Sequence, residues 1–454
     1  MNIYYHLPVS IQNTIFSLYG KYKSFYRYSS EFNVYLNFLK NVEYKDSNFI
    51  LNFQNEKFSE LLEYIRYSDF YRKLYSEFGV DLSNVNCLDD IKKLPILDKD
   101  YLRNNIDLFI KNISYFSYSY NLTSGTSGTP IRIPFSREGV SHQWAIWWRH
   151  KKRFGLRNGD RHLMFGARIP ISQKQTKPPF WRWDLANNRC YLSSYHLKNL
   201  NFPYIIELIN SHKFKFFTGY PSAINQLCCY ILDNNIKILN KPNVIVCGSD
   251  KLYPVYENNM KEAFGCLVTE QYGMTEFAGN FSKCEFGAWH LDYECCFAEY
   301  IPIENTDLHK LVLTGWGNPI APMIRYDVGD VVKPDSDFKC LCGRSSEVVK
   351  SIEGRSEDYI KTSDGRMLMG FNQVLEYAVG VKEIQVIQKT ITSLEFKIVP
   401  SNNFDFEKTR SALQYQTRLR AGDNMEVLIL VVDSIPRAQS GKFKAVINEI
   451  GESA

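Results

Sequence analysis

The sequence predicts an α/β protein with two domains. The large N-terminal domain is expected to hold parallel-rich sheets covered by helices plus a small β subdomain, and the C-terminal domain to be a small, mobile α+β unit. The chain has 454 residues, more than one ordinary core holds. Its composition, 44% hydrophobic and 23% charged, is typical of globular proteins. Between about 162 and 276, apolar runs of strand length alternate with helical segments, the pattern of parallel sheets covered by helices.

The first elements of the large domain are predicted to be helical. Residues 56–118 carry apolar side chains at helical spacing, and the first long stretch ends at Gly79. A turn and a short helix follow within 92–105. Ser136 is suited to cap the next helix, because its hydroxyl can accept a hydrogen bond from a first-turn amide. That helix contains three tryptophans, Trp144, Trp147 and Trp148.

The first 40 residues are rich in Tyr and Phe, and basic residues outnumber acidic ones. Glu31 is the only acidic residue, against four basic ones, Lys21, Lys23, Arg27 and Lys40. A helix lying on a membrane surface is one interpretation of this composition. We favour the other, in which the segment packs against the main body of the protein.

The later elements complete the two predicted domains. Short strands and turns at about 285–354 predict the small β subdomain, so the large domain spans 1–354. Residues 355–454 alternate strand and helix patterns and form the predicted C-terminal domain. Within it, the apolar run Val427–Val432 is predicted to be a buried strand.

Charge and hydropathy exclude two classes of protein. The net charge is only +5 and is spread along the chain, whereas a nucleic-acid-binding protein needs a concentrated basic face. No apolar run approaches the roughly 20 residues of a membrane span, and the N-terminus does not resemble a secretory leader. We therefore expect a cytoplasmic protein whose 11 cysteines are reduced. A homodimer is an assembly that the sequence leaves open.

Residues 121–130, with the sequence NLTSGTSGTP, form the most polar and flexible loop of the chain. Gly125 and Gly128 permit positive φ angles and let successive backbone N–H groups point inward, and the hydroxyls add donors. Such a loop can cradle phosphate oxygens between a helical region and the strand that follows, although a solvated surface turn is the alternative. The loop is not a Walker A loop, because the motif GxxxxGK[ST] occurs nowhere in the chain. Gly441 and Lys442, for example, are followed by Phe443 and not by Ser or Thr.

Five further motifs follow this loop in order. They are Gly248–Leu252 (GSDKL), Gln271–Glu276 (QYGMTE), Arg325–Asp330 (RYDVGD), Gly354–Lys361 (GRSEDYIK) and Pro436–Lys444 (PRAQSGKFK). Together with the loop they resemble the motifs of the adenylate-forming superfamily, which includes acyl-CoA ligases, peptide-synthetase adenylation domains and luciferases. The region from residue 56 onward most resembles the phenylacetate-CoA ligase branch and its CapK-like relatives. The resemblance implies a ligase that uses ATP and Mg²⁺ to convert a carboxylic acid to an acyl-AMP.

The resemblance also implies where ATP binds. The loop would hold the β- and γ-phosphates through Thr123, Ser124, Gly125, Thr126, Ser127, Gly128 and Thr129. The adenine side would be formed by Gly248, Ser249 and Asp250. Tyr272, followed by Gly273, would stack on adenine, and Asp330 would accept hydrogen bonds from both ribose hydroxyls.

Catalytic roles follow from the same resemblance. Thr275 would contact the α-phosphate and Glu276 would bind Mg²⁺. Arg355 would reach the ribose or the phosphates. Lys442 would be the catalytic cation, a compact charge placed where negative charge develops, and the C-terminal domain would close about Glu357 to deliver it.

Four residues suggest a structural zinc site. Cys340 and Cys342 lie two residues apart in a predicted turn, and Cys284 and His290 lie upstream. Three thiolates and one imidazole are a common tetrahedral zinc set. The alternatives are unconnected side chains or a redox pair. The adjacent pairs Cys228–Cys229 and Cys295–Cys296 are interpreted as core residues.

The substrates are less well defined. The acyl pocket is expected near Tyr220, Pro221 and Ser222, with the tryptophan helix either lining it or simply packed. The acceptor would be CoA, an amine, a sugar intermediate or the thiol of a carrier protein, in a capsule or surface-polysaccharide pathway if the CapK likeness extends that far. A non-catalytic nucleotide-binding protein of the same fold is the alternative function, and a membrane-surface scaffold is a third.

Overall fold

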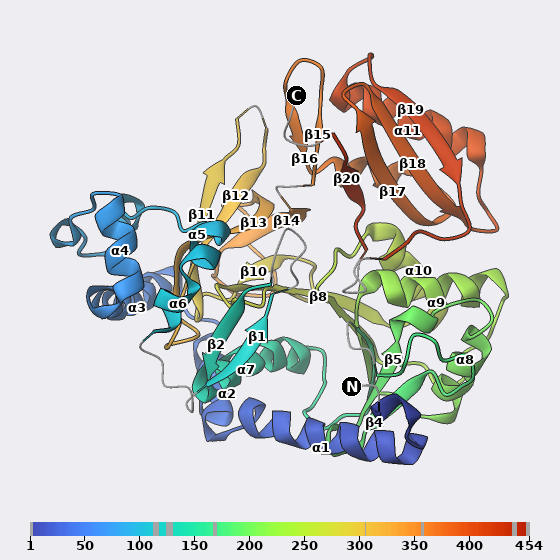
Figure 1. The fold of residues 1–454 in the computed structure, drawn as a ribbon, viewed down its shortest axis with the longest axis horizontal. Coiled ribbons are helices and arrows are strands. Elements are labelled where there is room, and N and C mark those ends of the chain that lie inside the picture. The colour runs from blue at the N-terminus through green and yellow to red at the C-terminus, as the bar shows by residue number, and fades with distance from the viewer. Residues whose placement is uncertain are drawn as a thin grey trace. The chain divides into compact units, whose positions relative to one another are not determined.

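The computed structural model of the chain describes residues 3–111, 118–123, 130–166, 170–304, 306–355, 358–437 and 443–450. These residues form two compact units that interleave along the sequence (Figure 1). Unit 1 contains 1–20, 159–270 and 353–454, and unit 2 contains 21–158 and 271–352. The predicted division between 1–354 and 355–454 stays a prediction. No helix in the described ranges is both long and apolar enough to cross a membrane.

Unit 1 alternates strands and helices, as the sequence predicts. Its first part contains η1 (Tyr4–His6), the start of α1 (Val9–Arg27), β3 (His162–Gly166), β4 (Trp181–Asp184), η5 (Leu185–Asn187), β5 (Arg189–Ser193), η6 (Ser194–His196), α8 (Phe202–Ser211), β6 (Phe216–Gly219), α9 (Pro221–Asp233), β7 (Val244–Gly248), α10 (Pro254–Phe264) and the start of β8 (Leu267–Gly273). The strands lie in the order β7-β6-β3-β5-β4, and only the edge strand β4 is antiparallel to its neighbour. This arrangement confirms the predicted parallel-rich sheet.

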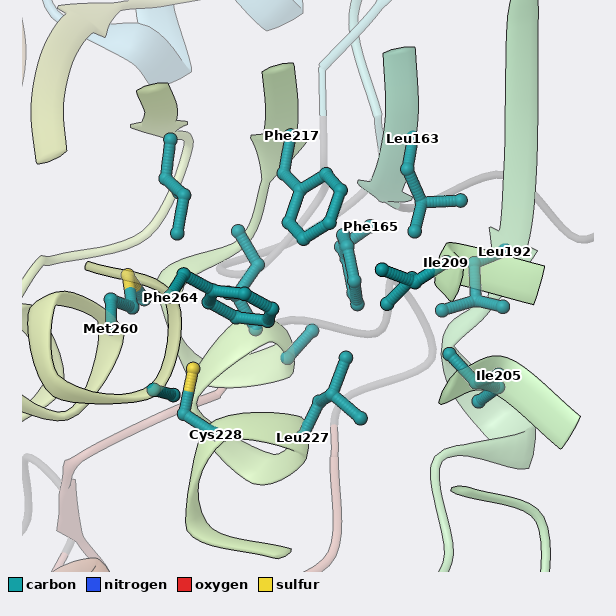
Figure 2. Close-up of a cluster of buried hydrophobic side chains, with 14 of the residues drawn as sticks. Leu163, Phe165, Leu192, Ile205, Ile209, Phe217, Leu227, Cys228, Met260 and Phe264 are labelled. Carbon is teal, nitrogen blue, oxygen red and sulfur yellow. The ribbon is translucent and has the colours of Figure 1, made fainter. Parts of the chain in front are cut away.

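The core of unit 1 lies between this sheet and its helices. Figure 2 shows strand side chains such as Phe165 and Phe217 facing side chains of α8, α9 and α10, among them Ile209, Leu227 and Phe264. All five are fully buried, so each contributes about 1.5–3 kcal/mol of hydrophobic stabilisation. Cys228 and Cys229 are also buried, as are Cys295 and Cys296 in unit 2, which confirms that both cysteine pairs are core residues.

Helix α1 covers the outer edge of β4. The Asn13 side chain accepts a hydrogen bond from the Trp183 amide at 3.0 Å, and the Ser17 hydroxyl accepts one from the Leu185 amide at 2.9 Å. Backbone groups at a sheet edge would otherwise be open to pairing with another chain. One face of the N-terminal segment therefore packs against the main body, as predicted.

The C-terminal part of unit 1 forms a second, smaller sheet with one long helix. It contains the end of β14 (Val348–Arg355), β15 (Tyr359–Lys361), β16 (Met367–Met369), η7 (Phe371–Tyr377), β17 (Val381–Thr390), β18 (Ser393–Pro400), α11 (Phe406–Ala421), β19 (Glu426–Val431) and β20 (Val446–Asn448). Four strands lie in the order β19-β18-β17-β20, drawn orange to red in Figure 1. This sheet and helix are the predicted α+β fold.

The prediction that Val427–Val432 forms a buried strand is wrong. The strand exists as β19, but it is the edge of its sheet, and Leu428 and Val431 are exposed. Only alternate residues, Val427 and Ile429, pack against the core. An edge strand covered on one face buries only half of its side chains, and an uninterrupted apolar run hides that alternation.

Unit 2 begins with helices and ends with antiparallel strands. It contains the end of α1, α2 (Ser30–Val42), α3 (Ser47–Tyr67), α4 (Asp69–Glu77), η2 (Leu82–Asn84), η3 (Leu88–Lys93), α5 (Lys99–Asn104), α6 (Ile106–Ile110), β1 (Tyr118–Leu122), β2 (Arg132–Ser136), α7 (Arg137–Arg153), β9 (Asn280–Lys283), β10 (Trp289–Leu291), β11 (Cys296–Pro302), β12 (His309–Gly315) and β13 (Met323–Pro334), with the end of β8 and the start of β14. The strands lie in the order β11-β12-β13-β14-β10-β9-β8.

Helix α7 is fixed in unit 2 by a cap and a buried ion cluster. The Ser136 hydroxyl accepts a hydrogen bond from the Gly139 amide at 3.0 Å, which confirms the predicted cap. At the other end, the buried Arg149 guanidinium pairs with Glu294 and lies 2.5 Å from Asp292. Because all three groups are nearly inaccessible, the cluster fixes α7 beside the β9–β10 hairpin.

The tryptophans of α7 make packing contacts. The indole N–H of Trp148 donates to the Tyr28 hydroxyl, and that of Trp147 donates to the Asn280 side chain. Trp144 and Trp147 meet edge to face with ring centroids 5.1 Å apart. These contacts favour the packing interpretation of the tryptophan helix.

Candidate active site

The predicted site residues are distributed over both units. Unit 2 holds Thr123, Tyr272, Gly273, Thr275, Glu276 and Asp330, and unit 1 holds Tyr220, Pro221, Ser222, Gly248, Ser249, Asp250 and Arg355. Ser124, Gly125, Thr126, Ser127, Gly128, Thr129, Glu357 and Lys442 lie outside the described residues.

In unit 2, the expected adenine and ribose residues meet. Tyr272 lies at the end of β8 and Asp330 lies in β13. The Tyr272 hydroxyl donates to Asp330 Oδ2 at 2.6 Å, and its ring meets Phe281 edge to face at 5.9 Å. A carboxylate has about four acceptor positions, so Asp330 can keep this hydrogen bond and still accept two from a ribose. The pair places an aromatic face beside a carboxylate, which suits a nucleoside.

Glu276 is buried in unit 2 and is held by two partners. The Tyr326 hydroxyl donates to Glu276 Oε1 at 3.1 Å, and Lys99 Nζ lies 3.5 Å from the same oxygen. Carboxylate oxygen is the ligand type that Mg²⁺ prefers, so the donor fits its expected role. No contact of Thr275 in the described ranges bears on its predicted role.

Lys99 is a site residue that the sequence reasoning missed. The segment before it pairs with β13, through Leu97 N to Arg325 O at 2.8 Å and Asp327 N to Leu97 O at 2.9 Å. Asp98 then caps α5, which starts at Lys99. The short helix after a turn was predicted, but its pairing with β13 depends on tertiary contacts that local patterns do not reveal.

Replacing Lys99 by glutamine is expected to lower the Mg²⁺ concentration needed for half-maximal activity about five-fold. The reason is the loss of a positive charge beside the expected Mg²⁺ ligand, worth about 1 kcal/mol in a partly solvated site. A Mg²⁺ titration of pyrophosphate release at fixed ATP measures this shift. Lys73→Gln, at an exposed lysine of the same unit, is the matched control. An increase in the Mg²⁺ requirement would mean that Lys99 instead binds phosphate.

The ends of the 121–130 loop lie in a β-hairpin. β1 and β2 are antiparallel, with Leu122 opposite Arg132. The Thr123 hydroxyl accepts a hydrogen bond from the Ile131 amide at 2.9 Å, and the Thr123 amide donates to the Ile131 carbonyl at 3.0 Å. The expectation of a helical region leading into the loop is wrong, because cross-strand pairing makes that region a strand. Thr123 itself is buried and, through its bonds to Ile131, joins the two ends of the loop.

In unit 1, two predicted segments lie at the ends of neighbouring parallel strands. β6 ends at Gly219, before Tyr220, and β7 ends at Gly248, before Ser249 and Asp250. Ligands of α/β proteins commonly bind at this end of parallel strands. Burial and the nearby Asp250 carboxylate raise the pKa of Tyr220 to about 12, so the phenol is neutral and can donate a hydrogen bond.

The backbone at these strand ends is specialised. Gly219 has φ +139°, and a Cβ there would lie 1.8 Å from the Phe165 carbonyl oxygen, so only glycine fits. Pro221 begins α9, where the missing N–H costs nothing, and Ser222 is buried behind it. Ser249 has φ +68°, a strained conformation for a side-chain-bearing residue. Strain of this kind often marks functional positions.

The segment around the predicted hinge is attached to the adenine-side segment. Lys251 Nζ lies 2.8 Å from the buried Glu353 carboxylate and 3.8 Å from Glu376. Arg355 ends β14, and its carbonyl accepts a hydrogen bond from the Asp358 amide at 3.1 Å.

Both ends of the lysine motif are held by β17. The Arg437 guanidinium pairs with the buried Glu383 carboxylate, which also accepts a hydrogen bond from the Gln226 amide at 2.7 Å. On the other side, the Gln385 amide donates to the Lys444 carbonyl at 2.6 Å. Glu383 is a second residue that the sequence reasoning missed.

Cys284, His290, Cys340 and Cys342 come together in unit 2. Their ligand atoms all lie within 4.8 Å of one another, with Cys284 Sγ 3.5 Å from Cys340 Sγ and Cys342 Sγ 3.3 Å from His290 Nε2. Metal–ligand bonds of about 2.0–2.3 Å in tetrahedral geometry put ligand atoms about 3.3–3.8 Å apart. The cluster is therefore slightly wider than a closed zinc site, and the donor set fits Zn²⁺.

The protonation of the cluster also suits a metal. Burial and the nearby Arg344 lower the pKa of His290 to about 3, so the imidazole is neutral and can act as a ligand. Its other nitrogen, Nδ1, lies 3.4 Å from the Ser346 hydroxyl, a contact that orients the ring. Burial opposes ionisation of Cys342, but hydrogen bonds involving Arg344 and Cys340 outweigh it and lower the pKa of this thiol. Burial raises the pKa of Cys340 to about 12 without a metal.

Two family descriptions match this chain. Residues 117–296 match "AMP-binding enzyme", and residues 360–449 match "CapK C-terminal domain". The chain is 26% identical to Protein CapK of Staphylococcus aureus over 454 residues, which cover 99% of both chains. These similarities confirm the predicted resemblance.

Solved structures show the same fold. The crystal structure of 2-hydroxyisobutyryl-CoA ligase in the postadenylation state, in complex with R3-HIB-AMP, has a TM-score of 0.68 at 17% identity, covering 90% of this chain and 91% of that one. The anthranilate CoA ligase AuaEII in complex with anthranoyl-AMP has a TM-score of 0.50 at 16% identity, covering 71% and 65%. The predicted α/β fold with a smaller C-terminal domain is confirmed.

Proposed function

We propose that this chain is an adenylate-forming ligase, which activates a carboxylic acid as an acyl-AMP and transfers the acyl group to an acceptor. The observation that carries the proposal is the hydrogen bond between Tyr272 and Asp330, with Glu276 in the turn that follows β8. Unit 2 thus contains an aromatic ring that can stack on adenine, a carboxylate that can accept hydrogen bonds from ribose, and a second carboxylate that can bind Mg²⁺.

The proposed first step joins the acid to AMP. A carboxylate oxygen attacks the α-phosphorus of ATP, the bond to the β-phosphate bridging oxygen breaks, and pyrophosphate leaves with both bonding electrons. Asp330 and Tyr272 hold the nucleoside, and Lys442 offsets charge at the reacting oxygens. Bound Mg²⁺, held by Glu276, would neutralise phosphate charge. Residues 123–129 would hold the β- and γ-phosphates, and closure about Glu357 would exclude water.

Replacing Tyr272 by phenylalanine is expected to raise the KM for ATP about five-fold and to change kcat little. The ring that stacks on adenine is kept, but the hydroxyl that orients Asp330 is lost, at a cost of about 1 kcal/mol. Steady-state kinetics at varied ATP measure the effect. Tyr415→Phe, at an exposed tyrosine of α11, is the control. An unchanged KM would show that the hydrogen bond does not contribute to nucleotide binding.

For the acid and the acceptor, we propose chemical classes and not individual compounds. The acyl pocket is proposed near Tyr220, Pro221 and Ser222, at the end of β6. CoA is one acceptor, as in the ligases of similar fold, and an amine or a sugar intermediate is the other. The similarity to Protein CapK favours a role in the synthesis of a capsule or other surface polysaccharide. A non-catalytic nucleotide-binding protein is the alternative.

Pyrophosphate release from MgATP with a panel of carboxylic acids tests the function. Release that depends on one class of acid is expected, and it should fall in Asp330→Ala. Adding CoA, and separately amines, to the preformed acyl-AMP then identifies the acceptor. Nucleotide binding without pyrophosphate release for any acid would support the non-catalytic alternative.

A structural zinc ion is a separate proposal. Cys284, His290, Cys340 and Cys342 would hold it, joining the β9–β10 hairpin to the turn after β13. With four protein ligands the site would be closed, so the ion would stabilise unit 2 and take no part in the reaction.

A further inference from the structure

One edge of helix α1 carries a continuous row of exposed apolar side chains. Ile11 is 44% exposed, Ile15 40%, Leu18 63%, Tyr22 55% and Phe25 59%. Their spacing alternates between four and three residues, so they lie above one another on a single side of the helix. The row runs for about 21 Å at 1.5 Å per residue. We call these five residues the α1 stripe.

The stripe is not needed to hold the helix in place. The opposite face of α1 carries the packing contacts: Asn13 and Ser17 bind the edge of β4, and the Gln12 amide oxygen accepts a hydrogen bond from Arg182 Nε at 2.6 Å. Phe16 meets Tyr191 edge to face at 5.3 Å. A helix fixed by its polar and inner residues, with five large apolar side chains about half exposed along its other side, points to a partner on that side.

The charge around the stripe is basic. Residues 3–30 contain no aspartate or glutamate, whereas Lys21 and Lys23 lie in the last two turns of α1. Arg27, in the last turn, faces the protein instead, with its guanidinium 4.1 Å from the centre of the Trp144 ring. The Arg137 guanidinium lies 4.2 Å from the centre of the Phe25 ring, but it also interacts with the Glu31 carboxylate, so it adds less positive charge than the two lysines. Glu31 is the first acidic residue of the chain, and Glu138 follows Arg137. The complementary partner is therefore an anionic surface.

A second copy of this chain fits the stripe less well. Helix pairs with this spacing select their partners through opposite charges beside the apolar seam. The charged side chains of α1 are all basic, so two copies would bring like charges together. The aromatic residues at the C-terminal end, Tyr22 and Phe25, with Tyr19 also exposed, instead suit the headgroup region of a bilayer.

We propose that α1 binds an anionic phospholipid surface, lying in its plane with the α1 stripe inserted among the headgroups and with Lys21 and Lys23 beside lipid phosphates. The helix does not need to cross the bilayer. This surface is independent of the proposed ligase activity, because none of its residues belongs to the candidate active site. It would place the protein at the membrane.

Vesicle sedimentation of the full chain tests the proposal. We expect the wild-type protein to sediment with phosphatidylcholine vesicles containing phosphatidylserine and to bind vesicles of phosphatidylcholine alone at least ten-fold more weakly. Ile15→Ser combined with Leu18→Ser should lower binding at least ten-fold through lost apolar insertion. Lys21→Gln combined with Lys23→Gln should lower it about twenty-fold at low salt, since each lysine near such a surface contributes about five-fold.

Leu200→Ser combined with Leu239→Ser is the matched control, because both leucines are exposed apolar residues of unit 1 away from α1. Its binding should equal that of the wild type, and thermal unfolding should show that all variants are folded. Wild-type protein that stays unbound, or a stripe variant that binds like the control, would overturn the proposal. So would a dimer in light scattering that the stripe variant abolishes, since the stripe would then join two copies.

Discussion

Replacing Lys442 by alanine is expected to slow acyl-adenylate formation about a thousand-fold. In the proposed step, negative charge develops between the carboxylate and the α-phosphorus, and a positioned cation is most valuable where charge appears only in the transition state. Removing one such preorganised group from an enzyme costs about a hundred- to a thousand-fold. The rate of pyrophosphate release in a single turnover, with saturating acid and MgATP, measures the effect.

The chain offers a close control for this substitution. Lys444 follows two residues later in the same motif, has the same charge, is half exposed and lies 3.2 Å from Asp358. Lys444→Ala should therefore change the rate less than two-fold. Equal loss in both variants would indicate that general positive charge in the motif matters and would remove the specific role of Lys442. Retained adenylate formation in Lys442→Ala would refute the assignment outright.

A separate readout distinguishes a chemical role from a binding role. If Lys442 acts on the transition state, its removal should lower kcat and kcat/KM together and leave the KM for ATP nearly unchanged. Tyr272→Phe is expected to do the opposite. The two variants together thus separate the cation that assists the reaction from the residues that hold the nucleotide.

Local patterns in the sequence predicted which segments form helices and strands better than they predicted which of these elements lie side by side. The alternating segments between 162 and 276 form the parallel strands and covering helices that were expected, and Ser136 caps α7. These features depend on periodicity and on contacts three residues apart, which a sequence displays directly. The strand β19 shows the limit, because an apolar run does not reveal whether a strand lies at an edge or at the centre of its sheet.

In the candidate active site too, the sequence did not reveal contacts between side chains that lie far apart in the chain. Ordered motifs predicted Tyr272, Glu276 and Asp330 as a group, and the structure places Tyr272 against Asp330. The partners Lys99 and Glu383 were not predicted, because each reaches its contact through pairing of segments far apart in the chain. A lysine or a glutamate in a charged stretch is usually solvated, so its residue type alone gives no signal.

Removing the proposed zinc ion should have the second large effect, this time on stability. Cys342→Ser is expected to abolish the binding of about one zinc per chain and to lower the midpoint of thermal unfolding by about 5–10 °C. An ion that binds only the folded state at a thousand times its dissociation constant stabilises that state by about 4 kcal/mol. Scanning calorimetry and metal analysis, on protein purified without chelator, measure the two effects.

Cys87→Ser is the matched control, because Cys87 is an exposed thiol of the same unit that lies outside the cluster. It should keep the zinc and the unfolding midpoint of the wild type. Replacing the ion by Co²⁺ should give the visible absorption of a tetrahedral thiolate site in the wild type and in Cys87→Ser, and none in Cys342→Ser. Full stability in the wild-type protein after chelation, or an absence of zinc before it, would show that the four side chains meet without a metal. In that case Cys284 and Cys340, whose sulfur atoms are 3.5 Å apart, would be the residues to examine for a thiol–disulfide role instead.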